Sequence, residues 1–96
     1  MTWEEKLQAC QALGEVSLKM RKPGDWYVSQ NIEVKSGGVL HSVYGNGSTP
    51  KKAVENHWEK LTVLKSSQYI VLNFCDDNRR AVKWNGFMWE EIEENK

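Results

Sequence analysis

The longest regular pattern along the chain is an alternation of apolar and polar residues between positions 26 and 35. One face of this segment carries Trp26, Val28, Gln30, Ile32 and Val34. A period of two over ten residues predicts a half-buried strand. After a glycine-rich turn at residues 36–38, residues 39–44 are expected to return as the second arm of a hairpin.

A shorter alternation of the same kind occupies residues 16–20. It favours either a short strand or an extended connector. The following residues 22–25 contain Pro23-Gly24. We expect a turn there, because proline fixes φ and glycine allows a positive φ.

Two segments carry the signals of helices. Thr2 and Glu5 form a capping box ahead of apolar residues at helical spacing, which predicts an amphipathic helix over residues 3–13. Thr49 followed by Pro50 is a strong helix start, because the hydroxyl caps free N–H groups and proline fits the first helical position. The apolar residues that follow predict a second helix over residues 50–63.

The C-terminal third is rich in strand-forming residues. Residues 69–74 are expected to form one strand, followed by a turn at 76–78. Asn85-Gly86 then separates residues 79–84 from 87–92, which predicts a hairpin with a two-residue type I′ turn. Such a loop would pair three sets of residues on one face: Trp84 with Phe87, Val82 with Trp89 and Arg80 with Glu91. Residues 93–96 are expected to be a short frayed tail.

The expected order of elements is therefore a helix, a strand or connector at residues 16–20, and then β–β–α–β–β–β. Strands and helices do not alternate strictly, which argues against a parallel doubly wound sheet. We predict a single α+β domain over residues 1–96. It would contain an antiparallel sheet of about five to six strands with both helices packed on one face.

Composition narrows the class of protein. The 96 residues are 40% hydrophobic with a formal net charge of zero, which is too apolar for disorder and lacks the dense basic surface of a duplex-DNA binder. No apolar run reaches the about 18 residues that span a membrane, and the N-terminus does not resemble a signal peptide. We therefore expect a cytoplasmic protein that does not act at a membrane.

The cysteines and histidines do not form a recognisable reactive motif. Cys10 and Cys75 lie in apolar periodic segments, which favours buried free thiols, with a disulfide between them as the alternative. His57 is expected to be hydrogen-bonded and partly buried on the second helix, and His41 to be partly buried in a strand. Their spacing matches no zinc motif, so we predict neither a metal site nor a cofactor. A Cys–His nucleophile pair would need a spatial contact that the sequence does not indicate.

Residues 45–49, which lead into the second predicted helix, are a candidate anion-binding segment. Its glycines precede a helix N-terminus, where free N–H groups can hold a phosphate. Two lysines in the first helical turn oppose the helix dipole, which an anionic ligand would explain. The segment lacks the Gly-Lys-Ser/Thr ending of a P-loop, and a plain turn with a cap is the other interpretation. The candidate anion-site residues are Gly45, Gly47, Thr49, Lys51 and Lys52.

The C-terminal hairpin combines aromatic and basic side chains. Its aromatic face could be core beneath a helix, or an exposed surface for a protein or for stacked nucleic-acid bases. Interfaces are enriched in tryptophan and arginine, whereas the glutamates on the same hairpin weaken the nucleic-acid interpretation. The predicted partner-binding residues are Arg79, Arg80, Lys83, Trp84 and Trp89.

Residues 44–58 and 78–89 resemble small accessory proteins encoded by bacteriophages and prophages. That resemblance implies a role such as inhibiting a host defence or binding a host enzyme. The pattern of Gly45, Gly47, Thr49 and Ala53 is also similar to the antitoxin domain of HicB-type toxin–antitoxin pairs. The chain differs from that family in its N-terminal helix and its C-terminal aromatic hairpin.

These observations favour a non-enzymatic phage or prophage protein that binds a host macromolecule, with a host protein as the expected partner. The alternative is a small nucleic-acid binder that uses the same hairpin. Steep salt dependence would distinguish the second class from the first, because phosphate contacts release counterions. An enzyme is the third class, and it would require a cluster of titratable groups assembled from distant residues.

Overall fold

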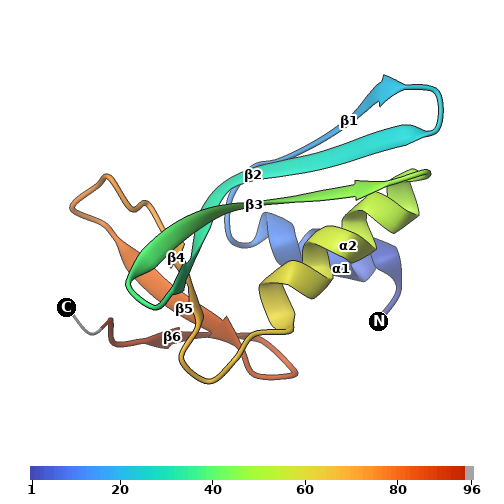
Figure 1. Ribbon diagram of the computed structural model, residues 1–96. Coiled ribbons are helices and arrows are strands. Elements are labelled where there is room, and N and C mark those ends of the chain that lie inside the picture. The colour runs from blue at the N-terminus through green and yellow to red at the C-terminus, as the bar shows by residue number, and fades with distance from the viewer. Residues whose placement is uncertain (95–96) are drawn as a thin grey trace.

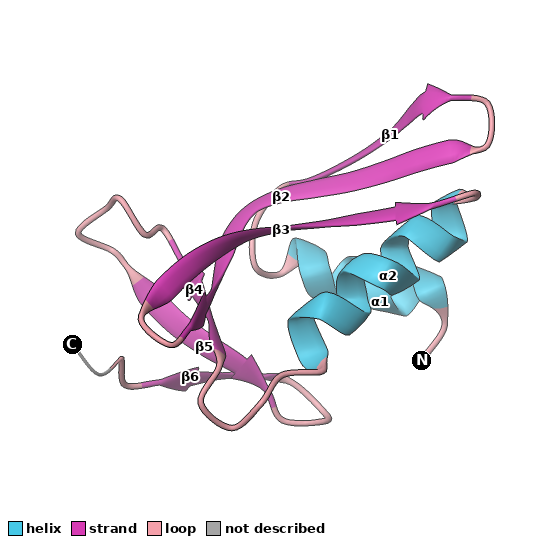
Figure 2. Cartoon of the chain, viewed as in Figure 1, coloured by secondary structure: helices cyan, strands magenta, loops and turns pink. Residues whose placement is uncertain are grey.

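The computed structural model describes residues 1–94, and within them the chain forms an α+β fold of two helices and six strands (Figures 1 and 2). The elements are α1 (Trp3–Gln11), β1 (Val16–Lys22), β2 (Asp25–Ser36), β3 (Val39–Gly47), α2 (Pro50–Thr62), β4 (Tyr69–Leu72), β5 (Arg80–Trp84) and β6 (Trp89–Ile92). All strand pairs are antiparallel, which confirms the predicted fold class.

Strand β2 organises the sheet because it pairs along both of its edges. One edge pairs with β3, and the other pairs first with β1 and then with β4. The sheet continues from β4 through β5 to β6. Between Ser29 and Glu33 the register with β3 shifts, so that residues 30–32 lie opposite Val43 alone. Such a bulge bends a strand, and Figure 1 shows β2 curving from one half of the sheet into the other.

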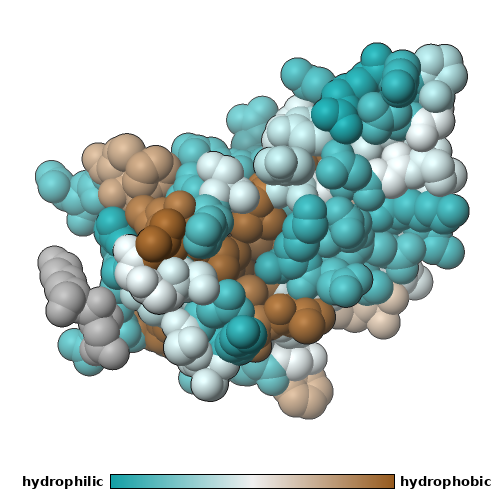
Figure 3. All heavy atoms as spheres, viewed as in Figure 1, coloured by the Kyte–Doolittle hydropathy of each residue, from teal (hydrophilic) through white to brown (hydrophobic). Residues whose placement is uncertain are grey.

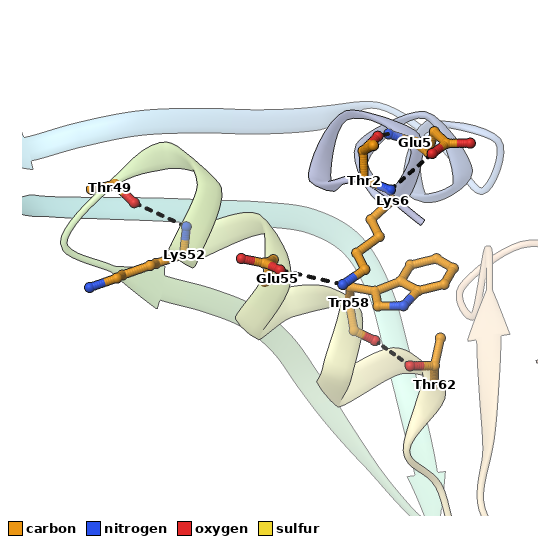
Figure 4. A network of polar contacts seen from close by, with 8 residues as sticks. All are labelled: Thr2, Glu5, Lys6, Thr49, Lys52, Glu55, Trp58 and Thr62. Carbon is orange, nitrogen blue, oxygen red and sulfur yellow. Dashed lines mark hydrogen bonds and ion pairs between the residues drawn. The ribbon is translucent and has the colours of Figure 1, made fainter.

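Local capping explains where the two helices begin (Figure 4). Thr2 accepts a hydrogen bond from the Glu5 amide at 3.2 Å, and the Glu5 carboxylate accepts one from the Thr2 amide at 2.9 Å. In α2, the Thr49 hydroxyl accepts from the Lys52 amide at 3.2 Å. Helix α1 ends at Gln11, earlier than predicted, because the chain tightens into turns that lead to Gly14 at φ 143°.

The hydrophobic core lies between the helices and the sheet. Helix α2 contributes Ala53, Val54, Trp58 and Leu61, and it also buries the polar His57. The larger cluster joins α2 to the far half of the sheet through Cys10, Ile32, Val34, Val43, Ile70, Leu72 and Val82. A smaller cluster places Val28 against the N-terminal half of α2. The two helices are also linked by an ion pair between Lys6 and Glu55 at 3.4 Å (Figure 4).

The predicted register of the β5–β6 hairpin is wrong by two residues. Trp84 pairs with Trp89, not with Phe87, and residues 85–88 form a four-residue loop. The Asn85 side chain sets this loop, because its Oδ1 accepts hydrogen bonds from the amides of Phe87 and Met88 at 2.9 and 3.0 Å. Because the shift is two residues, Trp84 and Trp89 still lie on the same face of the hairpin, as expected.

Other local predictions also need correction. Residues 45–47 belong to β3 and not to a loop. The strand alternative for residues 16–20 is confirmed, and this strand, β1, continues to Lys22. Strand β4 ends at Leu72, since Asn73 adopts a positive φ of 54°. Two expectations of burial are wrong: Cys75 is exposed in the β4–β5 turn, and His41 is exposed on β3, which pairs with β2 along one edge only.

The structure describes only the first two residues of the tail expected at positions 93–96. Glu94 forms ion pairs with Arg79 and Lys35, so this part of the tail is held against the sheet. Asn95 and Lys96 lie outside the described residues.

Candidate binding surface

Both tryptophans predicted to bind a partner pack against the helices. Trp84 and Trp89 lie with Trp58 of α2 in a cluster of edge-to-face rings, with centroids 4.8, 5.7 and 5.0 Å apart. The indole N–H of Trp89 donates to the carbonyl of Ala9 in α1 at 2.8 Å. Both side chains are half-buried. The aromatic face of the hairpin therefore lies against α1 and α2, with only its margin exposed.

The basic residues predicted to bind a partner all have intramolecular partners. Arg79 pairs with Glu94, and Arg80 pairs with Glu91 across the hairpin. Lys83 Nζ donates to the carbonyl oxygen of Lys65 at 2.9 Å. Because all three side chains are engaged in this way, they do not form a row of unpaired positive charges on the hairpin.

The Glu94 carboxylate is the meeting point of charges from three elements. It contacts Arg79 beside β5 and the Lys35 ammonium of β2 at 3.2 Å. The hydrogen bond from Arg79 lowers the pKa of Glu94 to about 2. The carboxylate is thus ionised at neutral pH and fixes the C-terminal segment to the sheet.

The most exposed apolar side chains of the hairpin lie at its tip. Phe87 is 91% exposed and Met88 is 61% exposed. The tip is nevertheless ordered by the two hydrogen bonds to Asn85 Oδ1, a further bond from the Asn85 amide to the Met88 carbonyl, and Gly86 at φ 102°. In Figure 3, apolar atoms protrude at the end of this hairpin. The loop therefore presents two large apolar side chains to solvent on a fixed backbone.

Sequence reasoning missed this pair because it placed Phe87 within the strand. The available signal was Asn85, whose side chain can cap the amides two and three residues later. That geometry favours a longer loop over a type I′ turn, and the longer loop leaves Phe87 outside the sheet.

The candidate anion-site glycines have a packing role. A Cβ atom on Gly45 would lie 2.4 Å from the carbonyl oxygen of Ala53, and one on Gly47 would lie 2.4 Å from the Ala53 amide nitrogen. The glycines thus let β3 approach the backbone of α2. Thr49 caps α2 through the Lys52 amide, and the side chains of Lys51 and Lys52 are exposed. Anion binding by this set stays a prediction.

His57 is more deeply buried than predicted. Both amide hydrogens of Gln30 are donated to the carbonyls of Cys10 and Gly14, at 2.6 and 2.9 Å, so Gln30 Oε1 is left to accept from His57 Nε2 at 3.1 Å. Burial, aided by the charge of Lys60, lowers the pKa of His57 to about 4. The imidazole is therefore neutral at physiological pH, and its contact joins α2 to β2.

This burial predicts that acidification destabilises the fold. His57 titrates near pH 6.5 in an unfolded chain and near 4 in the folded one, so the unfolded state binds more protons between these values. The contribution of neutral His57 to the free energy of unfolding is therefore present above pH 6.5 and is lost as the pH falls below that value. Between about pH 7.5 and about pH 5 we expect a loss of about 2 kcal/mol in the free energy of unfolding. Urea titrations at several pH values measure it.

The matched variant for that measurement is His57→Gln, which lacks the titrating group. Its stability should be lower at pH 7.5 but should change less between pH 7.5 and 5. The window avoids Glu94, whose contribution is lost only as pH falls from 4.5 toward 2. If the free energy of unfolding changed equally with pH in both proteins, His57 would not titrate as described.

The remaining candidate groups do not converge on one another. Cys10 is buried, which raises its thiol pKa to about 12, whereas Cys75 is exposed in the β4–β5 turn, and both are free thiols. Within residues 1–94, no group of three or more His, Cys, Asp or Glu side chains is placed to hold a metal ion. Neither helix of this described part is long and apolar enough to cross a membrane.

Comparisons with known proteins found no matching family model, no matching curated protein and no matching solved structure.

Proposed function

We propose that this protein is a non-enzymatic phage or prophage accessory protein that binds a host protein in the host cytoplasm. The observation that carries the proposal is the exposed pair Phe87 and Met88 on an ordered turn. Exposed aromatic side chains on a fixed backbone are efficient anchors, because little conformational freedom is lost when they enter a partner's pocket. The sequence resemblance to phage and prophage proteins supports the source and the kind of partner.

The charges of the hairpin support a protein partner over a nucleic acid. Arg79 and Arg80 are each paired with a glutamate, and the whole chain has a formal net charge of zero. Nucleic-acid binding draws its affinity mainly from unpaired cations that replace counterions on phosphates. The hairpin offers an apolar anchor with balanced charge beside it, which suits a protein pocket.

The test is partner capture with a matched pair of variants. Tagged protein is incubated with lysate of the bacterial host, treated with nuclease and eluted in rising salt. We expect wild-type protein to retain a stoichiometric protein partner, and Phe87→Ala to weaken its binding by about tenfold or more. Phe74→Ala is the control, because Phe74 is also an exposed aromatic residue but lies in the β4–β5 turn.

Three results would contradict the proposal. Retention by Phe87→Ala equal to that of wild type would exclude the hairpin tip as the anchor. Equal losses in Phe87→Ala and Phe74→Ala would indicate a general effect of surface aromatics. A partner lost to nuclease or to moderate salt would assign the protein to the nucleic-acid binders.

A further inference from the structure

Strand β3 has one free edge, and α2 covers only part of it. Among residues 1–94, β3 pairs with β2 alone. Lys60 Nζ of α2 donates to the Tyr44 carbonyl at 2.9 Å, and Asn56 Oδ1 accepts from the Asn46 amide at 3.1 Å. Since these backbone groups contact α2, they point away from β2. The C-terminal half of the β3 edge is therefore capped by side chains.

The other half of this edge has no such cap. Backbone groups alternate along a strand, so the amides and carbonyls of Leu40 and Ser42 point the same way as those of Tyr44 and Asn46. In the part of the chain that the structure describes, no side-chain or turn hydrogen bond reaches Leu40 or Ser42 on this side. Leu40 and Ser42 thus present free backbone N–H and C=O groups to which an extended peptide can pair as a further strand.

A groove lies directly beside this uncapped edge. It has a volume of about 490 Å³ between β3 and the end of α2. Its lining comes from Val34, Ser36, His41, Ser42, Val43, Tyr44, Lys60, Val63, Leu64 and Gln68. Val63 is 74% exposed at its rim, and Figure 3 shows apolar atoms gathered in this hollow. The groove can therefore take an apolar side chain of a strand laid along residues 40–42.

The charge of the groove selects among possible occupants. Its lining includes the Lys60 ammonium and contains no aspartate or glutamate. The ammonium lies 5.3 Å from the centre of the Tyr44 ring, so it is held at the groove. A strand bearing carboxylates complements this charge. A second copy of β3 does not, because Val39–Gly47 contains no acidic residue that could face Lys60.

We propose that the groove between β3 and the end of α2 binds an extended acidic segment of a protein partner, which adds as a strand to residues 40–42. Main-chain hydrogen bonds to Leu40 and Ser42 would hold the segment, one of its apolar side chains would fill the groove, and a carboxylate would face Lys60. This surface is distinct from Phe87, so the hairpin variant tests one site and the variants below test the other.

The experiment selects peptides from a phage-displayed library of random decapeptides on the full-length protein. We expect enriched sequences to carry an apolar residue and an aspartate or glutamate two positions apart, because residues i and i+2 of a strand face the same side. A synthetic enriched peptide is then titrated by fluorescence anisotropy. Ser42→Pro should weaken its binding by about tenfold or more, because proline removes the outward N–H while edge positions tolerate it. Ser42→Ala keeps that N–H and should bind within about twofold of wild type.

A second measurement is independent of the variants' folding. The same peptide is N-methylated at either of its two sets of alternating backbone amides, because only one set of an added strand faces β3. Methylation of the set that faces β3 should abolish binding to wild-type protein. The proposal is overturned if no peptide is enriched, or if both N-methylated peptides bind like the parent. It is also overturned if folded Ser42→Pro binds the peptide normally, or if Ser42→Pro converts a wild-type dimer to a monomer, which would assign the edge to a second copy.

Discussion

Gly45→Ala is expected to lower the free energy of unfolding by about 3 kcal/mol or more. The added Cβ would lie 2.4 Å from the carbonyl oxygen of Ala53 and 2.7 Å from the backbone nitrogen of His57. Both atoms belong to the backbone of α2, so relief requires a shift of the helix and of the core beneath it. Since domains of this size are stable by about 5–15 kcal/mol, the loss is a large share of the total. Urea unfolding followed by tryptophan fluorescence measures it.

The control for this prediction is Gly86→Ala. Gly86 has a positive φ of 102°, which Gly45 does not, and a Cβ there would meet no atom within 4 Å. We expect a loss of about 1 kcal/mol, which reflects backbone strain alone. If the two variants lost the same small amount, the close approach of β3 and α2 would not be a determinant of stability.

Trp58→Ala is expected to cost about 3–5 kcal/mol. Trp58 is 8% exposed and packs edge-to-face against Trp84 and Trp89, so it ties α2 to the β5–β6 hairpin. Truncation leaves a cavity between these elements that neighbouring side chains cannot fill. Figure 4 shows Trp58 near the C-terminal end of α2, where the Thr62 hydroxyl donates to its carbonyl. The urea midpoint should fall, and near-ultraviolet circular dichroism of the tryptophans should weaken.

Phe87→Ala provides the contrast on the same hairpin. Phe87 is almost fully exposed, so its truncation should change the free energy of unfolding by no more than about 0.5 kcal/mol. A destabilisation as large as that of Trp58→Ala would mean that Phe87 belongs to the core. The contrast matters for binding assays: a loss of partner in Trp89→Ala would be mixed with a loss of stability, whereas in Phe87→Ala it would not.

The two surfaces proposed for partner binding differ in the kind of contact they offer. The tip of the β5–β6 hairpin presents side chains, Phe87 and Met88, for insertion into a pocket. The edge of β3 presents backbone groups beside a groove that contains Lys60. Variants at Phe87 and Ser42 are far apart in the sheet order, so their effects on binding are expected to separate.

The sequence determined the features that depend on near neighbours. The caps at Thr2 and Thr49 involve residues three positions apart, and both helices begin where these pairs predict. The alternation over residues 26–35 predicts β2 because burial on one face of a strand leaves a period of two. From these elements and their order, the α+β class with an antiparallel sheet followed.

Only the tertiary structure decided the features that join distant residues. The loop at Asn85-Gly86 is compatible with two registers, and in the structure Trp84 and Trp89 pair with each other and pack on Trp58, leaving Phe87 in solvent. Gly45 reads as a loop residue until α2 is placed against β3. The free edge beside the groove likewise depends on how far α2 extends along β3. Local sequence fixes backbone preferences over a few residues, whereas registers, close approaches and uncovered edges are set by packing between segments far apart in the chain.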